Sequence, residues 1–478
     1  MYRRWLTACV FLFVAVLLGA CNSGDTAAPA VSPTPSAVRQ SRTPRATGTP
    51  GPTPELAPPA PTAIINGTLV DGTGADGIED AYVLIREGRI EAAGCCASQL
   101  RIPSGYEIID AGGGTIMPGL IDGHVHITRA VINPDLVRFT TRVDEDALVP
   151  FVQAGFTTLR DVGTATVIMQ SMKFLTDRLE KQQRKSPHIV WAGPLITAVG
   201  GYPISVPRYA AGGQEVRSAE EAVALVDSLA DQGARIIKLG LEKGYYADEG
   251  WPLLSLDEVR AIADRAHERG LLVTAHVTSL DEVRLALDGG VDNLAHTPLE
   301  SLTDELIAEM LRKGMGIVST ATIWNPDGAQ IAAENVKRFA DAGGVVSIGT
   351  DFGCCDQVAG VEPYLYEMQF LQQAGMTPMQ LIVAATRNGA LLANAGDATG
   401  SVEVGKEADI VILDGDPLAD VNALRVVRIV IQDGRVVYER GGEVSTAGAA
   451  ASPAAARPPP LLSRRARLPG ALRPPAPP

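Results

Sequence analysis

Cysteine and histidine are scarce in this chain of 478 residues, which contains six of each. Cys9 and Cys21 lie near the N-terminus, and the other four form two adjacent pairs, Cys95–Cys96 and Cys354–Cys355. Adjacent pairs lack the spacing of a zinc ribbon, so the cysteines are not predicted metal ligands. A disulfide between the two pairs stays open, because sequence alone cannot establish a connectivity.

Positive charge is also in deficit. The formal net charge is -14, which disfavours nucleic acid as a partner because nucleic acid attracts basic surfaces. Hydrophobic residues make up 46% of the chain, enough for one large barrel or two to three smaller domains. A small molecule is the expected binding partner, and a homo-oligomer stays open.

The first apolar run is too short to span a bilayer comfortably, since it extends only from Leu6 to Leu18. It follows Arg3 and Arg4 and ends in Leu-Gly-Ala-Cys, which resembles a lipobox. We therefore expect residues 1–21 to be a lipoprotein signal, with Cys21 lipidated and the protein exported and anchored on a membrane surface at the cell surface or periplasmic face. An ordinary cleaved signal or a short uncleaved anchor is the alternative.

Two further segments are too biased in composition to bury a core. Residues 22–61 are rich in Pro, Thr, Ala and Ser and are expected to form an extended linker. Residues 441–478 are rich in Ala, Pro and Arg and are expected to be a disordered tail.

The most informative segment is 118–126, Pro-Gly-Leu-Ile-Asp-Gly-His-Val-His. Its apolar run predicts a strand, and side chains alternate across a strand with period two, so His124 and His126 point the same way. Two imidazoles converging from one strand can hold one metal ion. Two partly buried histidines near a strand end are the alternative.

Strands and helices alternate after residue 118. Ser218, Ser255 and Ser279, each with Glu three residues later, predict capping boxes that open helices, and Thr303 to Arg312 predicts another helix. Eight strands are expected near residues 118, 156, 188, 236, 272, 292, 316 and 345. Eight such units predict an α/β fold, a closed (β/α)8 TIM barrel over residues 118–399.

Strand patterns flank this barrel. Residues 62–117 are rich in strands and turns, and strands return over residues 400–440. We expect the two segments to pair in a small flanking β-sandwich domain. In the barrel, the C-terminal ends of the strands build one active site, and they carry His126, Lys238, His276, His296 and Asp351.

With these residues in place, the chain resembles the metal-dependent amidohydrolase superfamily, and within it the imidazolonepropionase-like and Xaa-Pro dipeptidase-like branch. The resemblance covers residues 62 to about 440. It is carried by the segments 118–126, 155–163, 236–238, 275–276, 290–296, 349–351, 374–378, 385–388 and 405–417.

The resemblance implies two divalent metal ions, with zinc expected. His124, His126 and Asp351 would bind the first, and His276 and His296 the second. Lys238 would bridge them as a carbamate, because a free ammonium cannot ligate a cation. The alternative for Lys238 is a salt bridge with Asp351 inside the barrel.

Catalytic and substrate roles follow from the same comparison. Asp351 would accept a proton from metal-activated water and return it to the leaving group. Arg160 could bind a substrate carboxylate, or else form an ion pair with Asp161 or Asp122.

The chain departs from the branch at two places. Tyr202 stands where relatives often have histidine, and the loop 241–248 replaces a Gly-Gly segment. We expect Tyr202, Tyr245 and Tyr246 either to favour bulky or aromatic acyl groups or simply to pack the loop.

We therefore expect a dinuclear metal hydrolase of amide or cyclic amide bonds, dipeptides among them. A lactonase or phosphotriesterase on the same metals and a non-catalytic metal-binding lipoprotein are the alternatives. The loss of a metal ligand would favour the non-catalytic lipoprotein, and no ligand of the expected set is lost.

Overall fold

The computed structural model describes residues 58–127, 145–182, 186–244, 250–353 and 359–441. The predictions made for the signal, Cys21, most of the linker, Tyr245, Tyr246, the pair Cys354–Cys355 and nearly all of the tail lie outside these residues. Cys95 and Cys96 are exposed free thiols.

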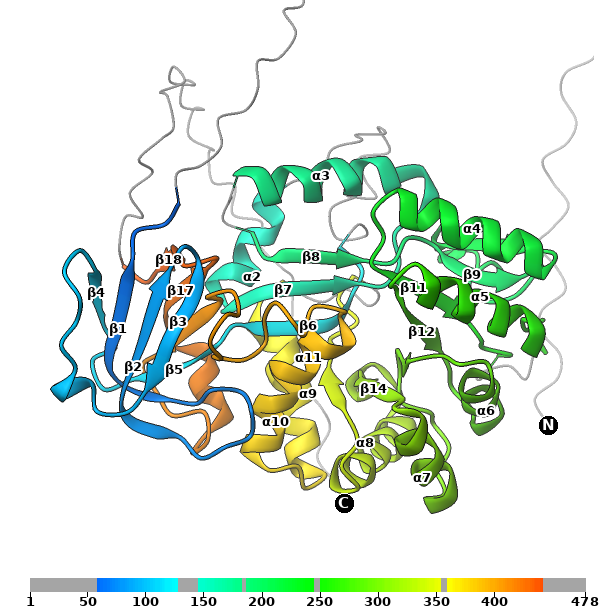
Figure 1. Cartoon of the computed structure of the whole chain (residues 1–478). Helices are drawn as coiled ribbons and strands as arrows, with labels where there is room; N and C mark the ends of the chain where they lie inside the picture. The colour runs from blue at the N-terminus through cyan, green and yellow to red at the C-terminus, as the bar shows by residue number, and fades with distance from the viewer. Residues whose placement is uncertain (1–57, 128–144, 183–185, 245–249, 354–358, 442–478) are drawn as a thin grey trace, which may run out of the picture. The chain divides into compact units, whose positions relative to one another are not determined.

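The two ends of the described chain pair in one mixed sheet, here called the flanking sheet (Figure 1). Its strand order is β18-β17-β16-β5-β1-β2-β3, and β4 pairs with β1. The strands are β1 (Thr62–Leu69), β2 (Ile78–Arg86), β3 (Arg89–Gly94), β4 (Glu107–Asp110), β5 (Thr115–Pro118), β16 (Ile410–Leu413), β17 (Val427–Gln432) and β18 (Arg435–Glu439).

The segment from β5 to β6 (Leu120–Val125) connects this sheet to the barrel. β5 pairs antiparallel with β16 in the flanking sheet, and the chain then enters the barrel strand β6 after Gly119. The close approach explains the glycine, since a Cβ on Gly119 would lie 2.1 Å from Oγ1 of Thr157.

Parallel strands form the barrel. After β6 come β7 (Phe156–Asp161), β8 (His188–Trp191), β9 (Leu195–Ala198), β11 (Ile236–Gly240), β12 (Leu272–His276), β13 (Asn293–Leu294), β14 (Gly316–Ser319) and β15 (Val346–Ile348). β6, β7 and β8 form one sheet, and the order β10-β9-β11-β12-β13-β14-β15 forms another, with β10 (Gly213–Val216) at its edge.

Hydrogen bonds close this arrangement into a ring. Arg235 N donates to Trp191 O at 3.0 Å, which joins the two sheets on one side. On the other side Asp351 N donates to His124 O at 2.8 Å, and His126 N donates to Phe352 O at 2.7 Å. The barrel prediction is thus confirmed, although the third strand position is divided between β8 and β9.

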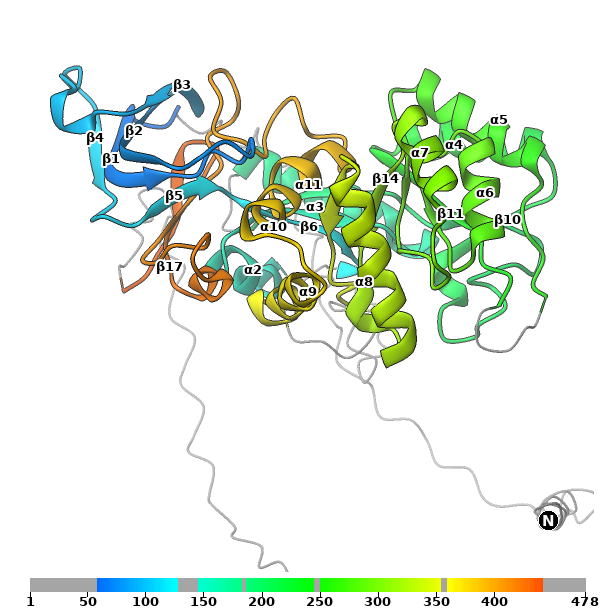
Figure 2. The same cartoon turned by 90° about the horizontal axis from the view of Figure 1, so that it is seen from below.

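Helices lie around the barrel strands (Figures 1 and 2). They are α2 (Val149–Gln153), α3 (Met169–Gln182), α4 (Ala219–Asp231), α5 (Leu256–Glu268), α6 (Leu280–Asp288), α7 (Asp304–Lys313), α8 (Pro326–Asp341), α9 (Val361–Gln373), α10 (Pro378–Ala385) and α11 (Arg387–Leu392). Among the described residues, no helix has the length and apolar character needed to cross a membrane.

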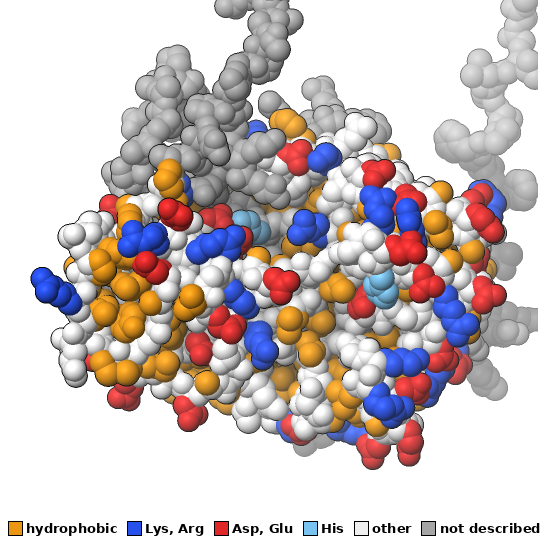
Figure 3. Space-filling model, in the orientation of Figure 1, with side chains coloured by type: hydrophobic (Ala, Val, Ile, Leu, Met, Phe, Trp, Pro, Cys, Tyr) orange, Lys and Arg blue, Asp and Glu red, His pale blue; other side chains and the backbone are white. Residues whose placement is uncertain are grey.

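The predicted helix starts follow from local chemistry. Ser255 and Ser279 each form a capping box with the glutamate three residues later. Ser218 accepts from Glu221 N, but the Glu221 carboxylate accepts from Arg217 N, one residue before the expected position. Helices α4 to α8 each bury apolar residues. Figure 3 shows acidic and basic side chains interspersed over one face of the molecule, with hydrophobic side chains gathered over the flanking sheet.

Candidate active site

Four histidines, one lysine and one aspartate meet at the C-terminal ends of the barrel strands. His124 and His126 lie at the end of β6, Lys238 in β11 and His276 at the end of β12, while His296 and Asp351 follow β13 and β15. All six side chains are buried, with exposures between 0% for His124 and 9% for His126. The structure thus brings together every predicted metal ligand.

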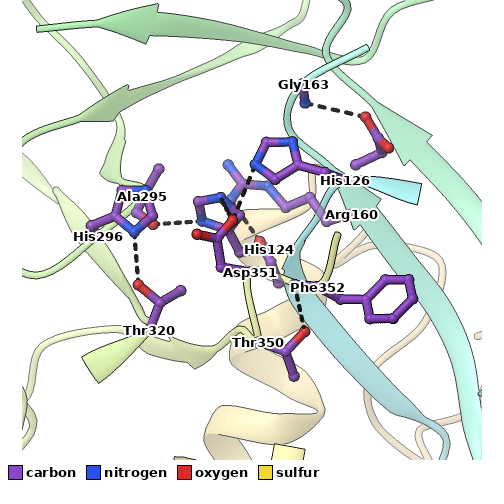
Figure 4. A network of polar contacts seen from close by, with 12 residues as sticks. His124, His126, Arg160, Gly163, Ala295, His296, Thr320, Thr350, Asp351 and Phe352 are labelled. Carbon is purple, nitrogen blue, oxygen red and sulfur yellow. Dashed lines mark hydrogen bonds and ion pairs between the residues drawn. The ribbon is translucent and has the colours of Figure 1, made fainter. Parts of the chain in front are cut away.

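Asp351 is the centre of the first group (Figure 4). Its Oδ1 lies 3.2 Å from Nε2 of His124 and 3.1 Å from Nε2 of His126. The residue has a φ of 53°, a left-handed conformation that is uncommon for a residue with a side chain and is often found at functional sites.

The atoms that face one another in this group have no hydrogen-bond partner. Nε2 of His124 and Oδ1 of Asp351 are both buried without one among the described residues. Buried polar atoms are normally paired, so this arrangement is unusual for a structural cluster. A divalent cation between them would satisfy both, and His124, His296 and Asp351 offer ligand atoms within 4.8 Å of one another. The residues present fit a metal site.

The outward nitrogens of two histidines are anchored. Nδ1 of His124 donates to Ala295 O at 2.6 Å, and a carbonyl can only accept, so Nε2 of His124 carries the lone pair. Nδ1 of His296 lies 2.7 Å from Oγ1 of Thr320. The ring centroids of His124 and His296 are 4.5 Å apart. Both rings are therefore oriented before any ion binds.

Burial and neighbouring groups shift the pKa values of His124, His296 and Asp351. Burial, assisted by Lys238, lowers the pKa of His124 to about 3, and burial with the neighbouring histidines holds the pKa of His296 well below its usual value. Burial alone would raise the pKa of Asp351, but His124 and His126 outweigh it and hold that pKa well below the usual range. The imidazoles of His124 and His296 are thus neutral and the Asp351 carboxylate is ionised at neutral pH.

Lys238 is 1% exposed and forms no ion pair with Asp351, whose close side-chain contacts within the described chain are with His124 and His126. Burial, with Arg160 as the next cause, holds the pKa of Lys238 well below its ordinary value. The structure therefore does not form the salt bridge that was the alternative for Lys238, and the amine is uncharged over more of the pH range than an exposed lysine.

Arg160 lies in the barrel interior. It is fully buried and donates to Gly123 O at 3.0 Å and to Oδ1 of Asn293 at 2.9 Å. Neither Asp161 nor Asp122 is among its hydrogen-bond or ion-pair partners in the described chain, so the predicted alternative ion pair is wrong. Those carboxylates instead accept from neighbouring backbone N–H groups and threonine hydroxyls. Binding of a substrate carboxylate by Arg160 stays a prediction.

Tyr202 lies against the second group of ligands. Its ring stacks on that of His276 with centroids 4.3 Å apart and an angle of 24°, and it faces the ring of Trp251 at 6.1 Å. Trp324 approaches His296 edge-on at 5.6 Å. The aromatic trio of Tyr202, Trp251 and Trp324 thus borders the histidines.

Sequence reasoning missed several residues of the site. Glu242 lies 2.6 Å from Nε2 of His276, and Thr320 and Asn293 hold His296 and Arg160. Glu242 stands in the loop where the chain departs from its relatives, which was the one available signal. Thr320 follows no recognisable pattern, and Asn293 lies in segment 290–296, from which only His296 was assigned a role.

A second polar cluster lies at the opposite end of the barrel. His188, the first residue of β8, has Nε2 3.3 Å from Oδ1 of Asp433 and 3.9 Å from Oδ1 of Asp409. Glu407 completes the group and also pairs with Arg89. These ion pairs account for the cluster, and a cavity of about 860 Å³ borders His188 there, away from the histidine site.

A parallel barrel gathers its active-site residues at the C-terminal ends of its strands, and the buried metal-type donors of this chain lie there. The sequence profile of the amidohydrolase family matches residues 115–437. The chain belongs to this family, and it is a hydrolase acting on carbon–nitrogen bonds.

Three relatives illustrate the similarity. An imidazolonepropionase from Geobacillus sp. (strain WCH70) is 24% identical over 401 residues, covering 76% of this chain and 91% of the relative. An ochratoxinase from Aspergillus niger is 27% identical over 270 residues, covering 49% and 53%. The crystal structure of a Xaa-Pro dipeptidase with methionine bound in its active site superposes with a TM-score of 0.68 at 25% identity, covering 80% of this chain and all of that one (100%).

Proposed function

We propose that this protein is a dinuclear metal-dependent amidohydrolase that cleaves amide or cyclic amide bonds. The observation that carries the proposal is the pair of buried atoms without hydrogen-bond partners, Nε2 of His124 and Oδ1 of Asp351. The names of the relatives support the bond type, because an imidazolonepropionase, an ochratoxinase and a Xaa-Pro dipeptidase are similar to this chain.

The donor set divides into two groups around one lysine. His124, His126 and Asp351 would hold one cation, and His276 and His296 the other. Lys238 would bridge both after its neutral amine adds carbon dioxide, which forms an N–C bond and releases one proton from nitrogen. The lowered pKa of Lys238 supports this step, since only the uncharged amine is a nucleophile.

Two divalent ions at this site, zinc being the proposed metal, would lower the pKa of a bound water towards neutrality and polarise the scissile carbonyl. Asp351 accepts the proton released as water adds to the carbonyl carbon. It then delivers that proton to the leaving nitrogen as the carbon–nitrogen bond breaks. The contacts of His124 with Ala295 O and of His296 with Thr320 keep these two proposed ligands in place.

The bordering aromatic rings favour a hydrophobic substrate. Tyr202, Trp251 and Trp324 offer large apolar faces close to His276 and His296. The substrates proposed are therefore N-acyl amino acids and hydrophobic dipeptides in preference to small polar ones. Arg160 is too deep in the barrel, at 0% exposure, to meet a substrate carboxylate without rearrangement.

A substrate panel tests the proposal. The purified protein is assayed against N-acyl amino acids, hydrophobic and polar dipeptides, lactones and phosphotriesters. Cleavage of amides with the highest kcat/KM supports the proposal, whereas a preference for lactones or phosphotriesters supports the alternative use of the same donors. Tyr202→Ala should narrow the kcat/KM ratio between hydrophobic and polar amides, and an unchanged ratio means that Tyr202 has no part in selection.

A further inference from the structure

Glu242 makes a contact that the roles described so far do not explain. Its Oε2 lies 2.6 Å from Nε2 of His276, and the two side chains are only 9% and 7% exposed. An ionised carboxylate can only accept a hydrogen bond, so Nε2 of His276 carries the proton. The lone pair of this imidazole is then on Nδ1.

The backbone around Glu242 is held on both sides. Leu241 N donates to His276 O at 3.1 Å, and Lys243 N donates to Oε1 of Glu282 at 2.9 Å. Glu282 is itself fully buried and accepts from the first backbone N–H groups of the turn that opens α6. The backbone on either side of Glu242 is therefore anchored next to His276.

The His276 ring is oriented by two contacts at once. The ring of Tyr202 stacks on the face of the His276 ring with centroids 4.3 Å apart, and Oε2 of Glu242 lies 2.6 Å from Nε2. The remaining edge carries Nδ1. The ring of His296, the other ligand expected for the second ion, lies 4.4 Å away in an edge-to-face arrangement.

We propose that Glu242 is a positioning residue for the second metal ion: it holds His276 in the tautomer that presents Nδ1 and makes that nitrogen a stronger ligand. This inference rests on the proposed function. The physical basis is general, since a carboxylate bonded to the far nitrogen of a metal-binding imidazole orients the ring and raises its basicity. Loss of such a partner typically weakens metal affinity by about 10- to 100-fold.

Metal titration of four proteins tests the role. Zinc dissociation constants are measured on metal-free wild type, Glu242→Ala, Glu242→Gln and the control Glu268→Gln, which replaces an exposed glutamate on α5. Glu242→Ala should weaken the second constant by about 10- to 100-fold and leave the first close to wild type. Glu242→Gln should lie between, because its amide oxygen still accepts from Nε2 without the charge. The control should match wild type.

A crystal structure of the zinc-loaded wild type gives a readout that does not depend on activity. Zinc should lie about 2.0 to 2.1 Å from Nδ1 of His276, with Glu242 still on Nε2. Zinc bound to Nε2, zinc bound directly by Glu242, or an unchanged second constant in Glu242→Ala would overturn the role of Glu242 while leaving the dinuclear site intact. A wild type that binds no second ion contradicts the proposed function and this inference together.

Discussion

Oδ1 of Asp351 lies close to both first-group histidines. This oxygen contacts His124 and His126, and the backbone of Asp351 adopts a φ of 53°, so the side chain lies at the centre of the site. Left-handed conformations of this kind persist where the surroundings over-determine them. The same carboxylate is able to carry a proton between water and a leaving nitrogen.

Asp351→Asn should reduce kcat by about 10²- to 10⁴-fold while leaving the fold intact. The amide can occupy the same position but cannot shuttle a proton. Turnover of the best amide substrate and circular dichroism measure the two properties. Wild-type turnover in this variant would refute the assignment of Asp351 as the base.

Lys238→Ala should lose both metal and activity, because no other group in the described barrel interior would bridge the two ions. Short carboxylic acids added to the variant should restore part of the activity by supplying two oxygen atoms in the vacated space. Metal content and rescue by acetate or propionate are the measurements. A metal-loaded crystal structure in which Lys238 ends in a plain amine would argue against carbamylation.

Among the elements, β8 is connected to the flanking sheet by His188, its first residue, which contacts Asp433 and Asp409. Burial would lower its pKa, but Asp433 and Asp409 outweigh burial and raise the pKa of His188 to about 9 from an ordinary 6.5. A raised pKa means that the folded state binds the proton more tightly. The stabilisation is therefore complete below about pH 6.5 and is lost as the pH rises through 9.

His188→Gln should reduce the free energy of unfolding at pH 6 by about 2 kcal/mol. It should also flatten the decline in the free energy of unfolding that is expected for wild type between pH 6.5 and 9. Denaturant unfolding at pH 6, 7.5 and 9 provides the test, with His267→Gln, which replaces an exposed histidine of α5, as the control. An equally steep decline in His188→Gln would exclude this ion pair as its origin.

Elements could be predicted from the sequence where local chemistry determines them. The capping boxes at Ser255 and Ser279 mark helix starts, and the strand ends that carry His276 and His296 follow from the alternation. Strand β13 is short: Asn293 and Leu294 are its two residues, and both pair with β12 and with β14. The contact of Glu242 with His276 joins residues 34 positions apart and depends on strand register, which no local pattern encodes.

For the whole molecule, a lipoprotein signal over residues 1–21 would decide where the hydrolase acts. We propose that Cys21 is lipidated and anchors the protein on a membrane surface, on the strength of the segment Leu-Gly-Ala-Cys at 18–21. Anchoring would place the barrel outside the cytoplasm, with substrates reaching it there.

Cys21→Ser should leave the protein unprocessed or release it from the membrane fraction. Fractionation followed by detection of the chain, with Cys9→Ser as control, measures this. Normal processing and unchanged membrane fractionation of Cys21→Ser would count against lipidation.

Metal content is the direct test of a dinuclear site. The protein is expressed in zinc-supplemented medium, freed of loosely bound metal by gel filtration and analysed for metal per chain. Wild type should contain two zinc equivalents, and the double variant His124→Ala/His276→Ala should lose both. No more than a trace of metal in the folded wild type would contradict the dinuclear site.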